Sequence, residues 1–123
     1  MNVDDVSTRL APCPGKPNCV SSWATDASHH IEPLTLTGSQ DNAMGRLEII
    51  LRGVPRVKIV TVDGGYLHAE FKSALFGFVD DVEFMAAPAA GVIHVRSASR
   101  VGYSDLGANR KRVENIRALF QTG

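Results

Sequence analysis

Three stretches in the second half of the chain alternate apolar residues with polar or charged ones, at the period of two that is typical of strands. They cover residues 66–72, 79–85 and 92–99. One side of these predicted strands carries Leu67, Ala69, Phe71, Val82, Phe84, Ile93 and Val95, and the other carries Tyr66, His68, Glu70, Lys72, Asp81, Glu83, His94 and Arg96. This pattern predicts an antiparallel sheet that is covered on one face only.

Two other stretches repeat their apolar residues at helical spacing. The first covers about residues 40–52 and ends at the stop signal formed by Gly53 and Pro55. The second begins near Ser104 or Asp105, or one or two residues later because a glycine follows, and reaches nearly to the C-terminus. Each predicted helix has one apolar stripe, so both can cover the same face of the sheet.

The remaining patterns complete the predicted fold. Residues 57–62 are rich in β-branched side chains and predict a strand that a hairpin turn at 63–65 joins to the next strand. Residues 31–37 predict a short extended segment, at a sheet edge because it contains Pro33. We therefore expect an α+β fold, with a four-stranded, mainly antiparallel sheet, two helices packed on one face and an N-terminal loop rich in cysteine and proline.

Length and charge limit the classes of function. The chain has 123 residues, and its thirteen basic and thirteen acidic side chains give a formal net charge of zero. We expect one domain over residues 10–123 after a flexible leader at residues 1–9, with a monomer as the default state. Zero net charge disfavours nucleic-acid binding. No apolar run approaches the length of about 18 residues that a membrane span needs, and the amino terminus lacks a signal-peptide pattern, so the sequence predicts a soluble chain.

The segment 95–112 holds the densest polar chemistry, with four arginines, three serines, a lysine and a tyrosine around two glycines. Strand alternation directs Asp80 toward the apolar side, where a carboxylate needs a partner, and we expect Arg100 or Arg110 to provide it. The candidate ligand-binding residues are Asp80, Arg96, Ser97, Ser99, Arg100, Tyr103, Asp105, Asn109 and Arg110.

Two interpretations of this segment follow from the residue types. In the first, an ion pair holds the loop at 101–108 against the end of the sheet. In the second, Arg100 and Arg110 grip a carboxylate or phosphate in a small pocket, helped by the amides at the start of the last helix.

The function that we expect is a non-enzymatic binding module for a small anion or a protein partner, at the cell envelope. The alternative is a small hydrolase or transferase that acts on an anionic substrate with Asp80 or Asp81 as general base. The chain has no Gly-x-Ser-x-Gly elbow and no phosphate-binding glycine loop, and we expect no cofactor and no metal.

Cys13 and Cys19 are the only cysteines and lie in a proline-rich loop. Their spacing suits a small disulfide loop, which would indicate an exported protein because the cytosol is reducing. Free thiols in a cytoplasmic protein are the second interpretation. Metal binding with His29 and His30, or redox chemistry, is the third, although this spacing differs from that of zinc fingers and redox pairs.

Three blocks of the sequence resemble the signature of a known family. They are Pro12-Cys-Pro-Gly-Lys-Pro-Asn-Cys-Val-Ser-Ser22, Phe78-Val-Asp-Asp-Val-Glu-Phe84 and residues 95–112. The chain is similar over 10–120 to a bacterial and plastid family catalogued as domain of unknown function 1499. The resemblance implies no activity, cofactor or catalytic residue. It implies relatives that are exported or tethered to membranes, and this chain differs from them because its sequence contains no segment of that kind.

Overall fold

The structure is a computed structural model that describes residues 10–122, so the leader expected at residues 1–9 lies outside the described residues. The elements in order are β1 (Cys19–Ser21), β2 (Leu34–Thr35), α1 (Gln40–Arg52), β3 (Val57–Asp63), β4 (Tyr66–Lys72), β5 (Val79–Ala87), the 3₁₀ helix η2 (Pro88–Ala90), β6 (Val92–Ser99) and α2 (Ala108–Thr122). The prediction of an α+β fold with a mainly antiparallel sheet and two helices is confirmed.

The sheet has six strands and not the four that we predicted. Its order is β1-β6-β5-β4-β3, and β2 also pairs with β6. The two additional strands are β1, which pairs antiparallel with residues 96–98, and β2, which pairs antiparallel with residues 92–93. Each has only two or three residues, too few to show a period of two, and each is a strand because β6 provides a partner far away in sequence.

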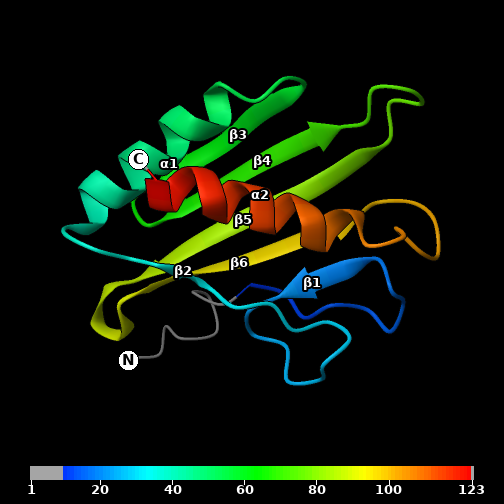
Figure 1. Ribbon diagram of the computed structural model, residues 1–123, viewed down its shortest axis with the longest axis horizontal. Helices are drawn as coiled ribbons and strands as arrows, with labels where there is room; N and C mark the ends of the chain where they lie inside the picture. The colour runs from blue at the N-terminus through cyan, green and yellow to red at the C-terminus, as the bar shows by residue number, and fades with distance from the viewer. Residues whose placement is uncertain (1–9, 123) are drawn as a thin grey trace.

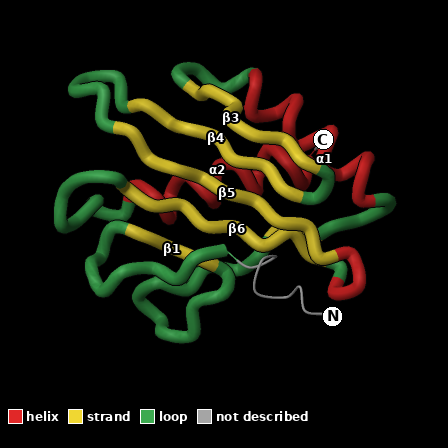
Figure 2. The backbone as a smooth tube through the Cα atoms, turned by 180° about the vertical axis from the view of Figure 1, so that it is seen from behind, coloured by secondary structure: helices red, strands yellow, loops and turns green. Residues whose placement is uncertain are grey.

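Both helices lie on one face of the sheet (Figure 1). The core between the layers contains fully buried residues from the strands, including Leu67, Phe84 and Val95, and from the helices, including Leu47 and Val113. Seen from behind, the opposite face of β3, β4 and β5 has no helix over it (Figure 2). This face carries the polar half of each alternating strand, as the sequence predicted for a sheet covered on one side.

The boundaries of the helices follow from their caps. The Ser39 side chain accepts a hydrogen bond from the Asn42 amide at 3.1 Å and caps α1. At α2, Asp105 accepts hydrogen bonds from the amides of Gly107 at 2.7 Å and Asn109 at 3.1 Å. Because Gly107 has a φ of 82°, the regular helix begins only at Ala108, after the turn that Asp105 closes.

One end of the molecule gathers three connections. The loop between β4 and β5 and the loop between β6 and α2 project at the same end in both views (Figures 1 and 2). The Arg100 amide, at the start of the second loop, donates a hydrogen bond to the Val79 carbonyl at the end of the first, over 3.2 Å. The connection from α1 to β3 reaches the same end, since Val57 pairs with Phe71 near the end of β4. Distant segments therefore meet here.

Candidate functional site

Asn109 lies at the centre of a buried polar network. Its side chain is fully buried, and its Oδ1 accepts hydrogen bonds from the Ser97 hydroxyl at 2.6 Å and from an Nη1 of Arg112 at 2.8 Å. Its Nδ2 donates to the Asp105 carboxylate at 2.7 Å, the Ser99 hydroxyl at 2.9 Å and a backbone carbonyl at 3.1 Å. Four of the candidate ligand-binding residues are thus hydrogen-bonded to each other inside the protein.

The same network fixes the cysteine loop and the start of α2. Asn18 provides the carbonyl that accepts from Asn109, and its own side chain donates to the Gly102 carbonyl at 2.9 Å. Burial alone would raise the pKa of Asp105, but hydrogen bonds from the Asn109 side chain and from the backbone amides of Gly107 and Asn109 together lower that pKa below its ordinary value. The amides at the helix start are occupied by this carboxylate, so they are not available to a bound anion.

Asp80 points to the helix side of the sheet, as predicted, but its partner differs from the prediction. The carboxylate forms an ion pair with Arg112 at 2.8 Å, and neither Arg100 nor Arg110 reaches it. The reason is strand and helix geometry. Arg100 continues the outward positions of β6, whereas Arg112 lies one helical turn after Asn109 and therefore faces the sheet.

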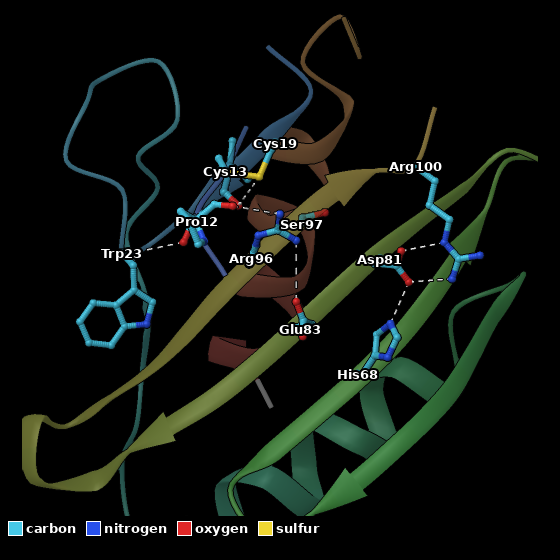
Figure 3. Close-up of polar contacts among 12 residues, drawn as sticks. Pro12, Cys13, Cys19, Trp23, His68, Asp81, Glu83, Arg96, Ser97 and Arg100 are labelled. Atoms are coloured by element: carbon cyan, nitrogen blue, oxygen red, sulfur yellow. Dashed lines mark hydrogen bonds and ion pairs between the residues drawn. A yellow bond between two sulfur atoms is a disulfide. The ribbon is translucent and has the colours of Figure 1, made fainter. Parts of the chain in front are cut away.

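Arg100 instead belongs to the open face of the sheet (Figure 3). Its guanidinium binds Asp81 through two hydrogen bonds, of 2.7 and 2.9 Å, and Glu70 through a third of 2.8 Å. His68 Nε2 lies 2.8 Å from Asp81 Oδ1, the oxygen that also accepts from Arg100 Nη2. The hydrogen bonds from Arg100 lower the pKa of Asp81 despite its partial burial, and they raise the pKa of Arg100.

Arg96 lies on the same open face, nearer the edge. Its Nη1 is 3.8 Å from Glu83, which also accepts a hydrogen bond from the Tyr66 hydroxyl, and its Nη2 donates to the Pro12 carbonyl at 3.3 Å. Burial and the Glu83 hydrogen bond raise the pKa of Tyr66. Arg96 therefore links the N-terminal loop to the sheet (Figure 3).

Arg110 and Tyr103 complete the set of candidate residues, and Arg110 lines a small pocket of about 190 Å³ together with Asp105. Arg110 donates to the backbone carbonyls of His30 at 2.9 Å and Ser28 at 3.3 Å, so it tethers the loop before β2. Tyr103 is exposed on the loop between β6 and α2. The nine candidate residues are thus divided among the internal network, the open face, a loop tether and a loop tip, and no single pocket collects them.

Cys13 and Cys19 form a disulfide, with their Cα atoms 5.7 Å apart. The two histidines considered as metal ligands have other partners. His29 Nδ1 lies 2.6 Å from Asp26, and His30 Nε2 lies 3.0 Å from Glu32. Over residues 10–122, no group of three or more His, Cys, Asp or Glu side chains is arranged to hold a metal ion.

A groove of about 770 Å³ lies between α2, the connection from α1 to β3 and the end of β4. Sequence reasoning did not identify it. Its apolar lining includes Phe71, Ile116 and Leu119, and its full lining is Val54, Pro55, Arg56, Phe71, Lys72, Ser73, Leu106, Ala108, Lys111, Arg112, Asn115, Ile116, Ala118 and Leu119. The lining contains four basic side chains and no acidic one, although the whole chain is neutral. The groove therefore combines an apolar floor with positive charge.

Three of the four groove cations have no ion pair. Arg56, Lys72 and Lys111 are exposed, and none of them pairs with a carboxylate of residues 10–122. Arg112 is half-buried, pairs with Asp80 and lies over the Phe71 ring, 5.0 Å from its centroid. The carboxylates nearest this end, by contrast, are already paired or hydrogen-bonded.

Both non-glycine residues with positive φ in the described chain also line this groove. They are Arg56, with a φ of 62°, and Leu106, with a φ of 54°. A left-handed backbone costs a residue with a Cβ about 1 to 2 kcal/mol relative to the right-handed region. Backbone strain of this kind concentrates at functional sites, which makes the groove the best-supported candidate site in this part of the chain.

The sequence did not predict the groove because its residues come from three separate segments, 54–56, 71–73 and 106–119. The spacing within α2 was the available signal, since Lys111, Asn115 and Leu119 recur every four residues beside the apolar stripe. This spacing does not predict that Arg56 and Lys72 lie beside α2, because the pairing of β3 with β4 brings them to the same end of the molecule.

These observations define a small α+β domain with an antiparallel sheet covered on one face and a cationic, partly apolar groove at one end. A family model described as a protein of unknown function, DUF1499, matches residues 9–120, and the chain belongs to that family. The resemblance of its three sequence blocks is thereby confirmed. A search of curated proteins found no match. Among the described residues, no helix is both long and apolar enough to cross a membrane.

Proposed function

We propose that the protein is a non-enzymatic binding module whose groove takes an organic anion with an apolar body. The observation that carries the proposal is the lining of the groove, in which four basic side chains and no acidic one surround apolar residues. Its volume of about 770 Å³ falls in the range of small-molecule sites, about 300 to 1,000 Å³. The proposed anion site thus lies beside the loop at 101–108, which contributes Leu106 to its lining, and its cations are Arg56, Lys72, Lys111 and Arg112 in place of the predicted Arg100 and Arg110.

The arrangement of the lining suggests how such a ligand lies. Arg56, Lys72 and Lys111 are exposed and can meet an anionic headgroup without breaking an existing ion pair. Phe71 and Leu119 form apolar surface next to them, against which a hydrocarbon or aromatic body can pack. A compact inorganic anion would use only the first feature and a neutral hydrocarbon only the second, so the site favours a molecule that has both.

The alternative of a hydrolase or transferase finds less support in the geometry. Asp81 would be a weak general base, because the hydrogen bonds from Arg100 lower its pKa. Asp80 forms an ion pair with Arg112 on the helix side of the sheet. Neither carboxylate lines the groove, and the lining contains no other carboxylate to replace them.

The test compares three probes by calorimetry: dodecanoate, dodecanol and acetate. We expect dodecanoate to bind in the micromolar range and the other two to bind much more weakly. The double substitution Lys72→Gln/Lys111→Gln should weaken dodecanoate binding by about tenfold, since it removes two of three unpaired cations. Lys58→Gln, which removes an exposed lysine of β3 outside the groove, is the matched control and should leave the affinity unchanged. Equal binding of dodecanol and dodecanoate, or no binding of dodecanoate, would refute the proposal.

A further inference from the structure

The two loops that flank the groove expose an unusual amount of apolar surface. Six of the eleven exposed large apolar side chains of the described residues lie in these two loops, which together are only a small part of the chain. They are Leu75, Phe76 and Phe78 in the loop between β4 and β5, and Val101, Tyr103 and Leu106 in the loop between β6 and α2. Single exposed apolar residues are ordinary on a protein surface, but six at one end mark an interaction site.

This apolar surface consists of two projecting loop tips and is not flat. Both loops project beyond the strands at the same end of the sheet (Figures 1 and 2). Leu75 is 80% exposed, Phe76 70% and Leu106 95%, so these side chains extend into solvent at the loop tips. The Phe76 and Phe78 rings stack with centroids 5.5 Å apart, which gives the first loop an aromatic tip.

Among the described residues near the two loops, the charged side chains that form no ion pair are all basic, apart from Asp105. Residues 73–78 contain no charged side chain, and the carboxylate of Asp105 in the second loop is turned inward to cap α2. Behind the tips lie the unpaired cations Arg56, Lys72 and Lys111. This arrangement fits an anionic bilayer, because the apolar loop tips can reach the hydrocarbon while the cations behind them remain at the level of the anionic headgroups.

We propose that this end of the molecule, the two loop tips with the three cations behind them, docks on an anionic membrane surface. The loop side chains enter the interface between headgroups and hydrocarbon, while Arg56, Lys72 and Lys111 face the headgroups. A protein partner would be expected to bind a wide and continuous patch, whereas here the apolar side chains occupy two separate tips. The proposal goes beyond the groove ligand, because a peripheral membrane contact does not require the groove to be filled.

The first experiment is flotation of the full chain with vesicles. We expect binding to phosphatidylcholine vesicles that contain phosphatidylglycerol, weaker binding to pure phosphatidylcholine, and loss of the preference at high salt. The substitution Leu75→Ser/Phe76→Ser removes apolar loop surface outside the groove lining and should lower vesicle affinity by about tenfold or more. Ile49→Ser/Val62→Ser, which removes two exposed apolar side chains elsewhere, should have no effect.

The two proposals can fail separately. Leu75 and Phe76 do not line the groove, so their substitution should leave dodecanoate binding intact. Lost vesicle binding with retained dodecanoate binding supports membrane docking as its own property. Vesicle binding that the loop substitution does not change would overturn the docking proposal, whatever the groove binds.

A second measurement locates the contact directly. Phe76→Trp should show fluorescence quenched by brominated lipids, whereas Ile49→Trp, on the exposed side of α1, should not. The native Trp23 gives the background, which the unsubstituted protein measures. Absence of quenching at position 76 contradicts the proposal. So does sedimentation that reveals a dimer abolished by Leu75→Ser/Phe76→Ser, because the loops would then join two copies of the chain.

Discussion

The Asn109 network and the groove are neighbours at the start of α2, since Arg112 donates a hydrogen bond to Asn109 and also lines the groove. They differ in how far their polar side chains are paired. In the network the side-chain amide of Asn109 donates to Asp105, Ser99 and the Asn18 carbonyl. Asp105 Oδ1 accepts from the Gly107 amide, and its Oδ2 accepts from the backbone and the side chain of Asn109. In the groove, Arg56, Lys72 and Lys111 form no ion pair with residues 10–122. Satisfied polar groups hold the fold together, whereas unsatisfied ones remain available to a ligand.

This difference explains why a dense polar segment is a poor guide to a binding site. Residues 95–112 supply members of both regions: Ser97, Ser99 and Asn109 turn inward, while Lys111 faces the groove. Asp80 and Arg112 stand at the boundary, since their ion pair belongs to the interior and Arg112 also lines the groove. Substitutions on the two sides should therefore change different properties.

The largest effect is expected for Asn109→Leu. The substitution leaves the hydrogen-bonding groups of Ser97, Ser99, Asp105 and Arg112 without their buried partner, and it should lower the free energy of unfolding by about 3 kcal/mol or more. Urea denaturation measures it. Lys111→Ala, two residues along the same helix, should change stability by less than about 0.5 kcal/mol because Lys111 is exposed. Similar losses for the two variants would contradict the distinction between the regions.

Asp80→Asn should lower the stability of the protein and raise its affinity for dodecanoate. It leaves Arg112 half-buried without its carboxylate, which should cost about 2 kcal/mol, less than for a fully buried pair because both groups keep some solvent. The same change leaves the Arg112 charge unneutralised beside the groove, so dodecanoate affinity should rise by about threefold. Glu114→Gln is the control, since it removes an exposed carboxylate that pairs with Arg117 while Arg117 keeps its hydrogen bonds to the carbonyls of Glu32 and Pro33, and neither effect is expected. An unchanged affinity would mean that Arg112 does not face the ligand.

The disulfide should affect the network and not the groove. The loop that it closes holds Asn18, whose carbonyl accepts hydrogen bonds from the Asn109 side chain at 3.1 Å and the Ser99 amide at 3.0 Å. Cys13→Ser/Cys19→Ser should lower stability by about 2 kcal/mol, on the chain-entropy account of a short loop. Thermal unfolding with and without reductant measures the effect, and the reductant should not alter the serine variant. Dodecanoate affinity should stay the same, since no residue of this loop lines the groove.

Local periodicity identified the elements that have enough residues to show it. The predicted bounds of 40–52, 66–72 and 92–99 agree with α1, β4 and β6, because each of these segments buries one regular stripe. β1 was missed, and β2 lies inside the extended edge segment predicted at residues 31–37 but was not counted as a strand of the sheet, since the pairing of both with β6 is a property of the assembled sheet.

The candidate site was harder to predict than the fold. Alternation placed Asp80 on the correct side, and the same alternation, continued from β6, places Arg100 on the other side. The sequence therefore contained the signal that separates these two residues. The sequence carried no comparable signal for the groove, because the groove forms only where α2 lies beside Arg56 and Lys72 in the assembled fold.

Arg56→Gly should have the smallest effect on stability and, unlike the substitutions above, should raise it. Arg56 has a φ of 62°, which glycine adopts without a Cβ penalty, and the gain exceeds the extra entropy that glycine loses on folding, so stability should rise by about 0.5 to 1 kcal/mol. Arg52→Gly, near the end of the regular helix α1, should instead lower stability by about 1 kcal/mol. Dodecanoate affinity should fall for Arg56→Gly, because the substitution removes an unpaired groove cation. A variant that is more stable and binds less would show that the strain at Arg56 is retained for the ligand, whereas a variant that loses stability and keeps full affinity would show that Arg56 serves the fold.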